Sequence, residues 1–307
     1  MREQRWELPD GDFLDLSWSG SGNGDWAQAA TADDPRPIAI LLHGLEGDRS
    51  SNYIVGLTHA LQQRGWRSCL MHFRNCGKQP NRLARSYHSG ETSDIQLLVE
   101  HLRQQYPAAP LMVVGYSLGG NVLLKWLGEQ GANAAVDAAV AVSVPMRLDL
   151  CADRMETGLS RLYQWHLVSK LRRSSRRKFS QRDDSPYPLD KLRQLRSFRQ
   201  FDHQFTAPLH GFASTADYYQ RSSSRQFLRD IKVPTLIIHA LDDPFMTPGV
   251  IPEEAELAPS VTLELSEHGG HVGFISGQWP WRLDYWLDQR IPEFLAEQLD
   301  SSTNHSA

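Results

Sequence analysis

The sequence has few cysteines, almost balanced charge and no long apolar run. Three of its 307 residues are cysteines, and this odd number argues against a disulfide framework and favours a reducing compartment. The formal net charge of −4 gives no signal for nucleic-acid binding. No apolar run approaches the ~20 residues of a membrane span, and the first residues lack the apolar segment of a secretory signal. We therefore expect a soluble, cytoplasmic protein without a transmembrane segment.

Apolar runs alternate with helical patterns along much of the chain. Continuous apolar runs such as 38–42 are typical of strands covered on both faces. Strands are expected at 13–18, 38–42, 67–73, 111–114, 138–144, 234–240 and 261–265. Helices are expected at 52–64, 92–106, 121–128 and 281–299, the last with Leu283, Trp286, Leu287 and Phe294 on its inner face. This alternation predicts an α/β fold with a doubly wound, mostly parallel sheet.

Residues 146–200 interrupt the alternation. They contain no clear strand, several short helical stretches, and 14 Lys and Arg against 6 Asp and Glu. We interpret the chain as a core in two parts with a helical lid insertion and a frayed tail, at 1–145, 146–205, 206–300 and 301–307. The basic cluster at 170–178 is more often a solvated helix face than a binding site. Peripheral contact with an anionic membrane surface is the functional alternative.

A Gly-x-Ser-x-Gly sequence joins an expected strand to an expected helix. Gly115 and Gly119 flank Ser117 where side chains would collide as the strand and the helix crowd together. Such a turn holds the serine oxygen in the open, as the nucleophile elbow of an α/β hydrolase does. A glycine-rich turn without chemistry is the alternative, and the flanking strand and helix argue against it.

An activated serine needs a base and an orienting carboxylate, which follow it in this fold in the order Asp or Glu, then His. Asp243, in Asp-Pro-Phe-Met-Thr-Pro, follows the strand at 234–240 and is favoured over Asp242. His271 follows two glycines after the strand at 261–265 and is favoured over His268. The two histidines have the spacing of a metal pair, but no third ligand is suitably spaced. We expect a Ser117, Asp243 and His271 triad and no metal.

The oxyanion of an acyl-transfer reaction needs two backbone N–H donors. Leu118, which follows the nucleophile, is expected to supply one of them. Leu45, in His-Gly-Leu-Glu-Gly after the strand at 38–42, is expected to supply the other.

Several longer motifs resemble the YheT-like branch of the ABHD esterase/lipase family. They are His-Gly-Leu-Glu-Gly at 43–47, Met-His-Phe-Arg-Asn-Cys-Gly at 71–77, Pro-Asn-Arg at 80–82, Tyr-His-Ser-Gly-Glu-Thr at 87–92, Gly-Tyr-Ser-Leu-Gly-Gly-Asn at 115–121 and His-Gly-Gly-His-Val-Gly-Phe at 268–274. The resemblance implies a Ser-Asp-His hydrolase of small-molecule or lipid esters, of the carboxylesterase type and without a cofactor. Asn75 departs from the pattern, because relatives usually have Gly before the Cys.

Two other functions stay open at this point. An acyltransferase would pass the acyl group to an alcohol in place of water, although the acyltransferase-type His-x4-Asp motif is absent because Ser276 stands five places after His271. A non-catalytic, hydrolase-like binding protein would be favoured by loss of a triad member, and none is lost. The serine at position 117 argues against dehalogenase chemistry, which needs an aspartate there.

Overall fold

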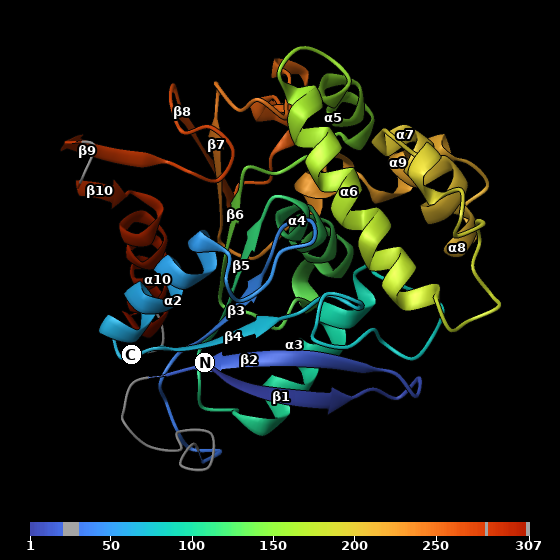
Figure 1. The fold of residues 1–307 in the computed structure, drawn as a ribbon. Coiled ribbons are helices and arrows are strands. Elements are labelled where there is room, and N and C mark those ends of the chain that lie inside the picture. Colours follow the sequence, from blue (N-terminus) through green and yellow to red (C-terminus); the bar gives the residue numbers. More distant parts are fainter. Residues whose placement is uncertain (21–30, 280–281, 305–307) are drawn as a thin grey trace.

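A computed structural model describes residues 1–20, 31–279 and 282–304 of the chain. Its main sheet has eight strands in the order β1-β2-β4-β3-β5-β6-β7-β8, and β9 and β10 pair separately (Figure 1). The strands are β1 (Arg2–Glu7), β2 (Phe13–Ser19), β3 (Ile38–Leu42), β4 (Arg67–Met71), β5 (Leu111–Tyr116), β6 (Ala138–Val142), β7 (Thr235–Ala240), β8 (Val261–Ser266), β9 (Ile275–Trp279) and β10 (Arg282–Tyr285).

The sheet is mostly parallel, as the alternation of strands and helices predicts. The six strands β4-β3-β5-β6-β7-β8 run parallel to one another. The strands β1 and β2 form an antiparallel hairpin, and β2 pairs antiparallel with β4. The first strand, β1, was not expected, because its Arg-Glu-Gln-Arg-Trp-Glu sequence has one apolar residue and its side chains are largely exposed. It forms because the edge of β2 offers a full set of backbone partners.

Helices cover both faces of the sheet, and the strand residues alternate between them. Ile38, Ile40 and Leu42 of β3 belong to the core under α3 (Ser93–Gln105) and α4 (Leu118–Gln130). Ala39 and Leu41 belong to the core under α2 (Asn52–Gln63) and α10 (Leu287–Asn304), which lie side by side (Figure 1). This two-sided burial explains why β3 is apolar at every position.

A largely helical insertion separates β6 from β7. Its helices are α5 (Leu148–Met155), α6 (Ser160–Phe179), α7 (Phe198–Phe201), α8 (Ala207–Leu209) and α9 (Thr215–Ser222), with a π-helical turn (Asp202–Thr206) between α7 and α8. Figure 1 shows these helices gathered on one side of the molecule. The sequence pattern predicted short helical stretches here, but α6 is one continuous helix of 20 residues. The boundaries of a lid at 146–205 stay a prediction.

The C-terminal region differs from its sequence-based prediction. A helix was expected from 281, but residues 282–285 form β10, which pairs with β9, and α10 begins at Leu287. The Ile, Trp and Tyr residues between 275 and 285 favour extended structure over helix. Trp286, Leu287 and Phe294 pack into the core as expected. Residues 280, 281 and 305–307 and the side chain of Leu283 lie outside the described part, and 301–304 continue the helix where a frayed tail was expected.

The basic cluster of α6 makes contacts with the protein itself. Arg176 and Arg177 donate to the carbonyls of Leu189 and Asn75, at 2.9 and 2.6 Å. Lys178 is buried and donates to Asn81 Oδ1 and to the Arg85 carbonyl. Burial lowers the pKa of Lys178 to about 7. The bonds of Arg177 and Lys178 attach α6 to the loop that follows β4, so part of the cluster has a structural role.

Candidate active site

The turn between β5 and α4 carries Ser117 at the carboxyl end of the sheet. Ser117 has a φ of 51° and a ψ of −118°, a conformation that is uncommon for a residue other than glycine. A Cβ on Gly115 would lie 2.5 Å from the Gly119 carbonyl oxygen, and one on Gly119 would collide with the Leu42 carbonyl. Both positions therefore require glycine, as the motif predicts.

The structure brings Ser117, His271 and Asp243 together from three separate loops. They follow β5, β8 and β7, whose carboxyl ends lie at the same edge of the sheet. His271 Nε2 lies 2.9 Å from Ser117 Oγ, and His271 Nδ1 lies 2.8 Å from Asp243 Oδ2. Since an ionised carboxylate only accepts hydrogen bonds, Nδ1 carries the proton and Nε2 accepts from the serine hydroxyl. This is the geometry of a nucleophile, its base and an orienting carboxylate.

The two candidate aspartates have different positions. The carboxylate of Asp243 is buried, and its second oxygen accepts the Phe245 N–H at 2.9 Å. Asp242 is exposed, and its Oδ1 accepts the N–H groups of Gly269 and Gly270 at 2.9 and 2.8 Å. These backbone bonds lower the pKa of Asp242. Asp242 thus holds the loop that carries His271, while Asp243 contacts the imidazole.

The competing histidine lies apart from the serine. The side chain of His268 is 88% exposed, and its Nδ1 lies 3.5 Å from Asp242 Oδ2. Among the residues that the structure describes, no group of three His, Cys, Asp or Glu side chains is arranged to hold a metal ion.

The two expected oxyanion donors, Leu45 and Leu118, line the same pocket as Ser117 and His271. A Cβ on Gly44 would lie 3.4 Å from Ser117 Cβ, so the loop after β3 passes directly beside the nucleophile. The N–H groups of Gly44 and Glu46 donate to the hydroxyls of Tyr53 and Tyr87, each at 3.0 Å. The Leu45 N–H between them has no acceptor within the described residues.

His43 connects the loop after β3 to the loop after β4. Its Nδ1 lies 2.7 Å from the Gly44 carbonyl, and its Nε2 lies 3.2 Å from the Phe73 nitrogen. A carbonyl only accepts and a backbone N–H only donates, so the ring is the neutral Nδ1–H tautomer. Complete burial lowers the pKa of His43 to about 3, which keeps it neutral.

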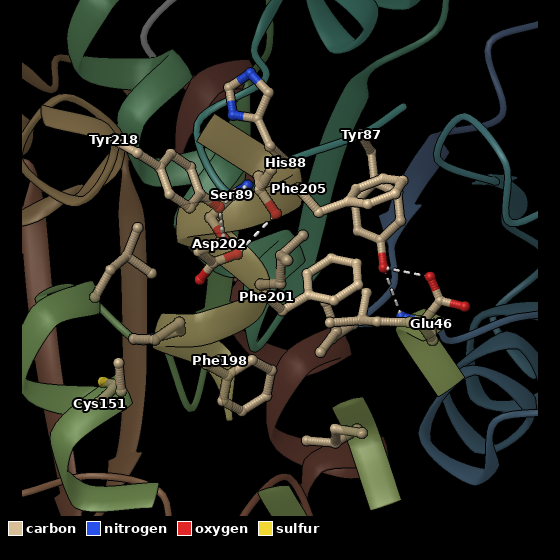
Figure 2. Close-up of a pocket in the computed structure, with 18 of the residues that line it drawn as sticks. Glu46, Tyr87, His88, Ser89, Cys151, Phe198, Phe201, Asp202, Phe205 and Tyr218 are labelled. Atoms are coloured by element: carbon tan, nitrogen blue, oxygen red, sulfur yellow. Dashed lines mark hydrogen bonds between the residues drawn. The ribbon is translucent and has the colours of Figure 1, made fainter. Parts of the chain in front are cut away.

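A partly buried carboxyl group lies next to the expected oxyanion donor. Glu46 has a φ of 51°, and its side chain reaches Tyr87, whose hydroxyl lies 2.9 Å from Glu46 Oε1. Burial raises the pKa of Glu46, and burial with the Glu46 charge raises that of Tyr87. Figure 2 shows this pair at one side of the pocket.

The pocket beside Ser117 is largely apolar. It encloses about 1070 Å³ including its open mouth. Aromatic and aliphatic side chains from the inserted helices form much of the wall, among them Leu148, Met155, Leu167, Leu171, Phe198, Phe201, Phe205 and Leu209. Figure 2 shows Phe198, Phe201 and Phe205 between the Glu46 pair and a polar group at the other side. Such a cavity suits an acyl chain or another apolar group.

The polar group of the pocket contains His88, Ser89, Asp202, His210 and Tyr218. Asp202 is partly buried, and its two oxygens accept bonds from the hydroxyls of Thr206 and Tyr219 at 2.7 and 2.8 Å. Burial raises the pKa of Asp202 to about 6. Burial also lowers the pKa of His88 to about 4 and that of His210 to about 3.

The comparisons with known proteins agree with this geometry. The model of the alpha/beta hydrolase fold family matches residues 37–278. The chain belongs to this family. It is 45% identical to YheT of Escherichia coli (strain K12), over 98% of this chain and 86% of that protein. It is 30% identical to the phospholipase ABHD3 of Mus musculus, over 97% of this chain and 72% of that protein. The YheT-like ABHD branch that the motifs predict is therefore confirmed.

Solved structures of the alpha/beta hydrolase fold resemble the chain throughout. The esterase Pf2001 of Pyrococcus furiosus aligns with a TM-score of 0.61 and 18% identity, over 97% of this chain and 90% of that chain. The esterase Est1E of Butyrivibrio proteoclasticus aligns with a TM-score of 0.56 and 15% identity, over 97% of this chain and 99% of that chain. These likenesses confirm the fold. Within the described residues, no helix is long and apolar enough to cross a membrane.

The residue that departs from the motif, Asn75, adopts a backbone conformation that also suits glycine. Asn75 has a φ of 74°, in the left-handed region where Asn is the most favourable residue after Gly. Its Nδ2 also donates to Ser174 Oγ on α6 at 2.7 Å. The asparagine therefore fits a turn that also suits glycine, and its side chain bonds to the inserted helices.

Sequence reasoning did not find Tyr53 and Tyr87, whose hydroxyls bond to the loop after β3. Tyr53 lies on α2 and Tyr87 on the loop before α3, far from the triad in sequence. Tyr87 and Glu46 entered the sequence analysis only as members of longer motifs. The one available signal was the Tyr-His-Ser-Gly-Glu-Thr motif at 87–92, whose length exceeds what a helix start requires.

Proposed function

We propose that the chain hydrolyses carboxylic esters, with Ser117 as nucleophile, His271 as general base and Asp243 as the orienting carboxylate. The observation that carries this proposal is the hydrogen-bonded series from Asp243 through His271 to Ser117 at the mouth of an apolar pocket. The esterase and phospholipase names of its relatives support the same reaction class.

In the first half of the reaction, Ser117 Oγ attacks the ester carbonyl carbon while His271 Nε2 takes the hydroxyl proton. The negative charge on the carbonyl oxygen is stabilised by the N–H groups of Leu45 and Leu118. The buried Asp243 carboxylate stabilises the imidazolium that forms. The bond between the carbonyl carbon and the alkoxide oxygen then breaks while His271 donates its proton to that oxygen. The alcohol departs, and the acyl group stays on Ser117.

In the second half, water replaces the alcohol. His271 Nε2 takes a proton from the water, whose oxygen attacks the acyl carbon, and the same two N–H groups stabilise the second oxyanion. Collapse of this intermediate releases the carboxylic acid and returns the proton to Ser117 Oγ. No cofactor enters either half of this reaction.

The proposed substrate is a small-molecule or lipid ester. The apolar wall favours an aliphatic or aromatic acyl group over a charged one. We also propose that residues 146–205 act as a lid, because helices from this segment supply much of that wall. A carboxylesterase and a phospholipase cleave the same kind of bond, so the alcohol side of the substrate decides between them.

A fluorophosphonate probe, followed by a p-nitrophenyl ester chain-length series, tests the proposal. We expect the wild-type protein to be labelled and the Ser117→Ala variant to be neither labelled nor active, since removal of the nucleophile costs up to ~10⁶ in rate in a well-studied serine hydrolase. Labelling of Ser117→Ala equal to that of the wild type would contradict the assignment. Product analysis with an alcohol acceptor present distinguishes hydrolysis from acyl transfer.

A further inference from the structure

The beginning of α6 exposes large apolar side chains to solvent. Leu159 is 78% exposed, Leu162 67%, Trp165 65% and Tyr163 49%. These four residues, called here the apolar face of α6, lie within seven positions of the chain. Single exposed apolar residues are ordinary, but a contiguous group of this size on one element indicates a surface that binds something apolar.

The charge on α6 indicates what this surface meets. The helix has seven Lys and Arg residues and no Asp or Glu. Arg161, Arg173, Arg176 and Arg177 are exposed, and none of them forms an ion pair with a carboxylate in the described part of the chain. The opposite face of the helix is buried, at Ser160, Gln164, Val168, Ser174, Ser175, Lys178 and Phe179. A helix whose outer surface exposes both large apolar side chains and arginines suits an anionic lipid surface.

The apolar face also lies beside the entrance to the proposed catalytic site. The Tyr163 ring is 5.1 Å from the ring of Phe245, which stacks on His271 at 4.0 Å. Ser160 donates to the Pro244 carbonyl at 2.5 Å, which fixes the start of α6 to the loop that carries Asp243. An outer groove leads to His271 as well, lined by Lys170 of α6 and by Ile275 and Tyr285 of the β9–β10 hairpin.

We propose that the apolar face of α6 docks on an anionic lipid surface, with Leu162 and Trp165 entering the acyl region and the arginines of the same helix against the headgroups. This inference rests on the proposed ester hydrolysis, because docking there places the pocket mouth against a source of esters. It differs from contact through the basic cluster alone, since the apolar residues supply most of the affinity.

Vesicle sedimentation of the Ser117→Ala protein tests the docking without turnover. We expect it to bind phosphatidylcholine vesicles that contain phosphatidylglycerol, and to bind pure phosphatidylcholine vesicles more weakly. A Leu162→Ser/Trp165→Ser double change on the same background should weaken binding by at least about tenfold. Val55→Ser is the matched control, because Val55 is 52% exposed on α2 and lies outside this face. It should bind as the parent does.

The outcomes separate the docking from the proposed chemistry. With Ser117 intact, the double variant should keep wild-type activity on a water-soluble p-nitrophenyl ester. No vesicle binding by the parent, or equal binding by the double variant, would overturn the docking. Loss of a dimer in the double variant, measured by size-exclusion chromatography without any vesicle binding, would also overturn it and assign the face to self-association. Failure of probe labelling would overturn the proposed hydrolysis and leave the vesicle result unchanged.

Discussion

The hydroxyl of Tyr87 bonds to Glu46 twice, once through the backbone and once through the side chain. It accepts the Glu46 N–H at 3.0 Å and donates to Glu46 Oε1 at 2.9 Å. Both bonds act on the residue that follows Leu45, whose N–H is the proposed oxyanion donor. The positive φ of Glu46 is therefore held by a side chain from a distant part of the chain.

Removal of the Tyr87 hydroxyl tests whether the Tyr87–Glu46 pair positions the loop that carries Leu45. We expect Tyr87→Phe to lower kcat by between about tenfold and about 100-fold with little change in KM, less than the 10² to 10³ lost when an oxyanion donor itself is removed. Tyr187→Phe is the control, since the Tyr187 hydroxyl makes no hydrogen bond within the described residues. A rise in KM at constant kcat would instead assign Tyr87 to substrate binding.

The two adjacent aspartates should respond differently to the same change. Asp243→Asn presents an amide to His271 and favours the wrong tautomer, so we expect the rate of ester hydrolysis to fall by about 10⁴. Asp242→Asn keeps an oxygen that can accept the Gly269 and Gly270 N–H groups, so its rate should fall by less than about tenfold. Steady-state kinetics on one soluble ester decides the assignment, and the reverse ranking would move it to Asp242.

We expect the partly buried Asp202 to make the free energy of unfolding depend on pH. Burial raises its pKa from 3.8 to about 6, so between these values the folded protein holds a proton that the unfolded chain has released. The free energy of unfolding therefore falls as pH rises from about 4 to about 6. Asp202→Asn removes this ionisation, and we expect it to raise the free energy of unfolding near pH 8 by up to about 3 kcal/mol and to change it little near pH 4.

Urea unfolding at the two pH values measures this difference. Asp183→Asn is the control for loss of an acidic residue, because Asp183 is exposed. An Asp202→Asn protein with the same pH dependence of unfolding as the wild type would show that the pKa of Asp202 is the same in the folded and unfolded states.

The asparagine at position 75 separates backbone conformation from side-chain bonding. Asn75→Gly keeps the left-handed turn but loses the bond to Ser174, so it should lower the free energy of unfolding by about 1 kcal/mol. Asn75→Ala loses the same bond and also places alanine, which tolerates the left-handed region less well than asparagine, at this φ. This should lower the free energy of unfolding by a further ~1 kcal/mol or more. Ser174→Ala should match the glycine variant in chemical denaturation. Equal effects of Gly and Ala would show that the turn is unstrained.

Much of the fold and the arrangement of the candidate site could be predicted because their signals are local. A strand buried on both faces is apolar throughout, as β3 is, and the elbow needs glycine where two backbones nearly touch. Asp243 and His271 follow recognisable strands in a known order, so their convergence on Ser117 follows from a parallel sheet. The structure adds the geometry that distinguishes Asp243 from Asp242.

The features that were missed depend on partners distant in sequence. The charged residues of β1 carry no strand pattern, and β1 forms because an open edge lies beside it. Tyr53 and Tyr87 reach the loop after β3 from separate elements, and no periodicity relates either of them to Leu45. The segment of β10 was taken as the start of a helix because Leu283 has helical spacing to Trp286 and Leu287.

The inserted helices leave and rejoin the core at two strands that are neighbours in the sheet. The chain departs from β6 and returns in β7, and these strands pair from Ala139 with Thr235 to Val142 with Ile238. The two ends of the insertion are therefore held close together by the sheet, so the entropy of closing this excursion depends only weakly on its length. Segments of different length and sequence can be exchanged between these two points while the strand register stays the same. Evolution or protein design can thus replace the pocket wall while the loops that carry Ser117, Leu45 and His271 stay in place.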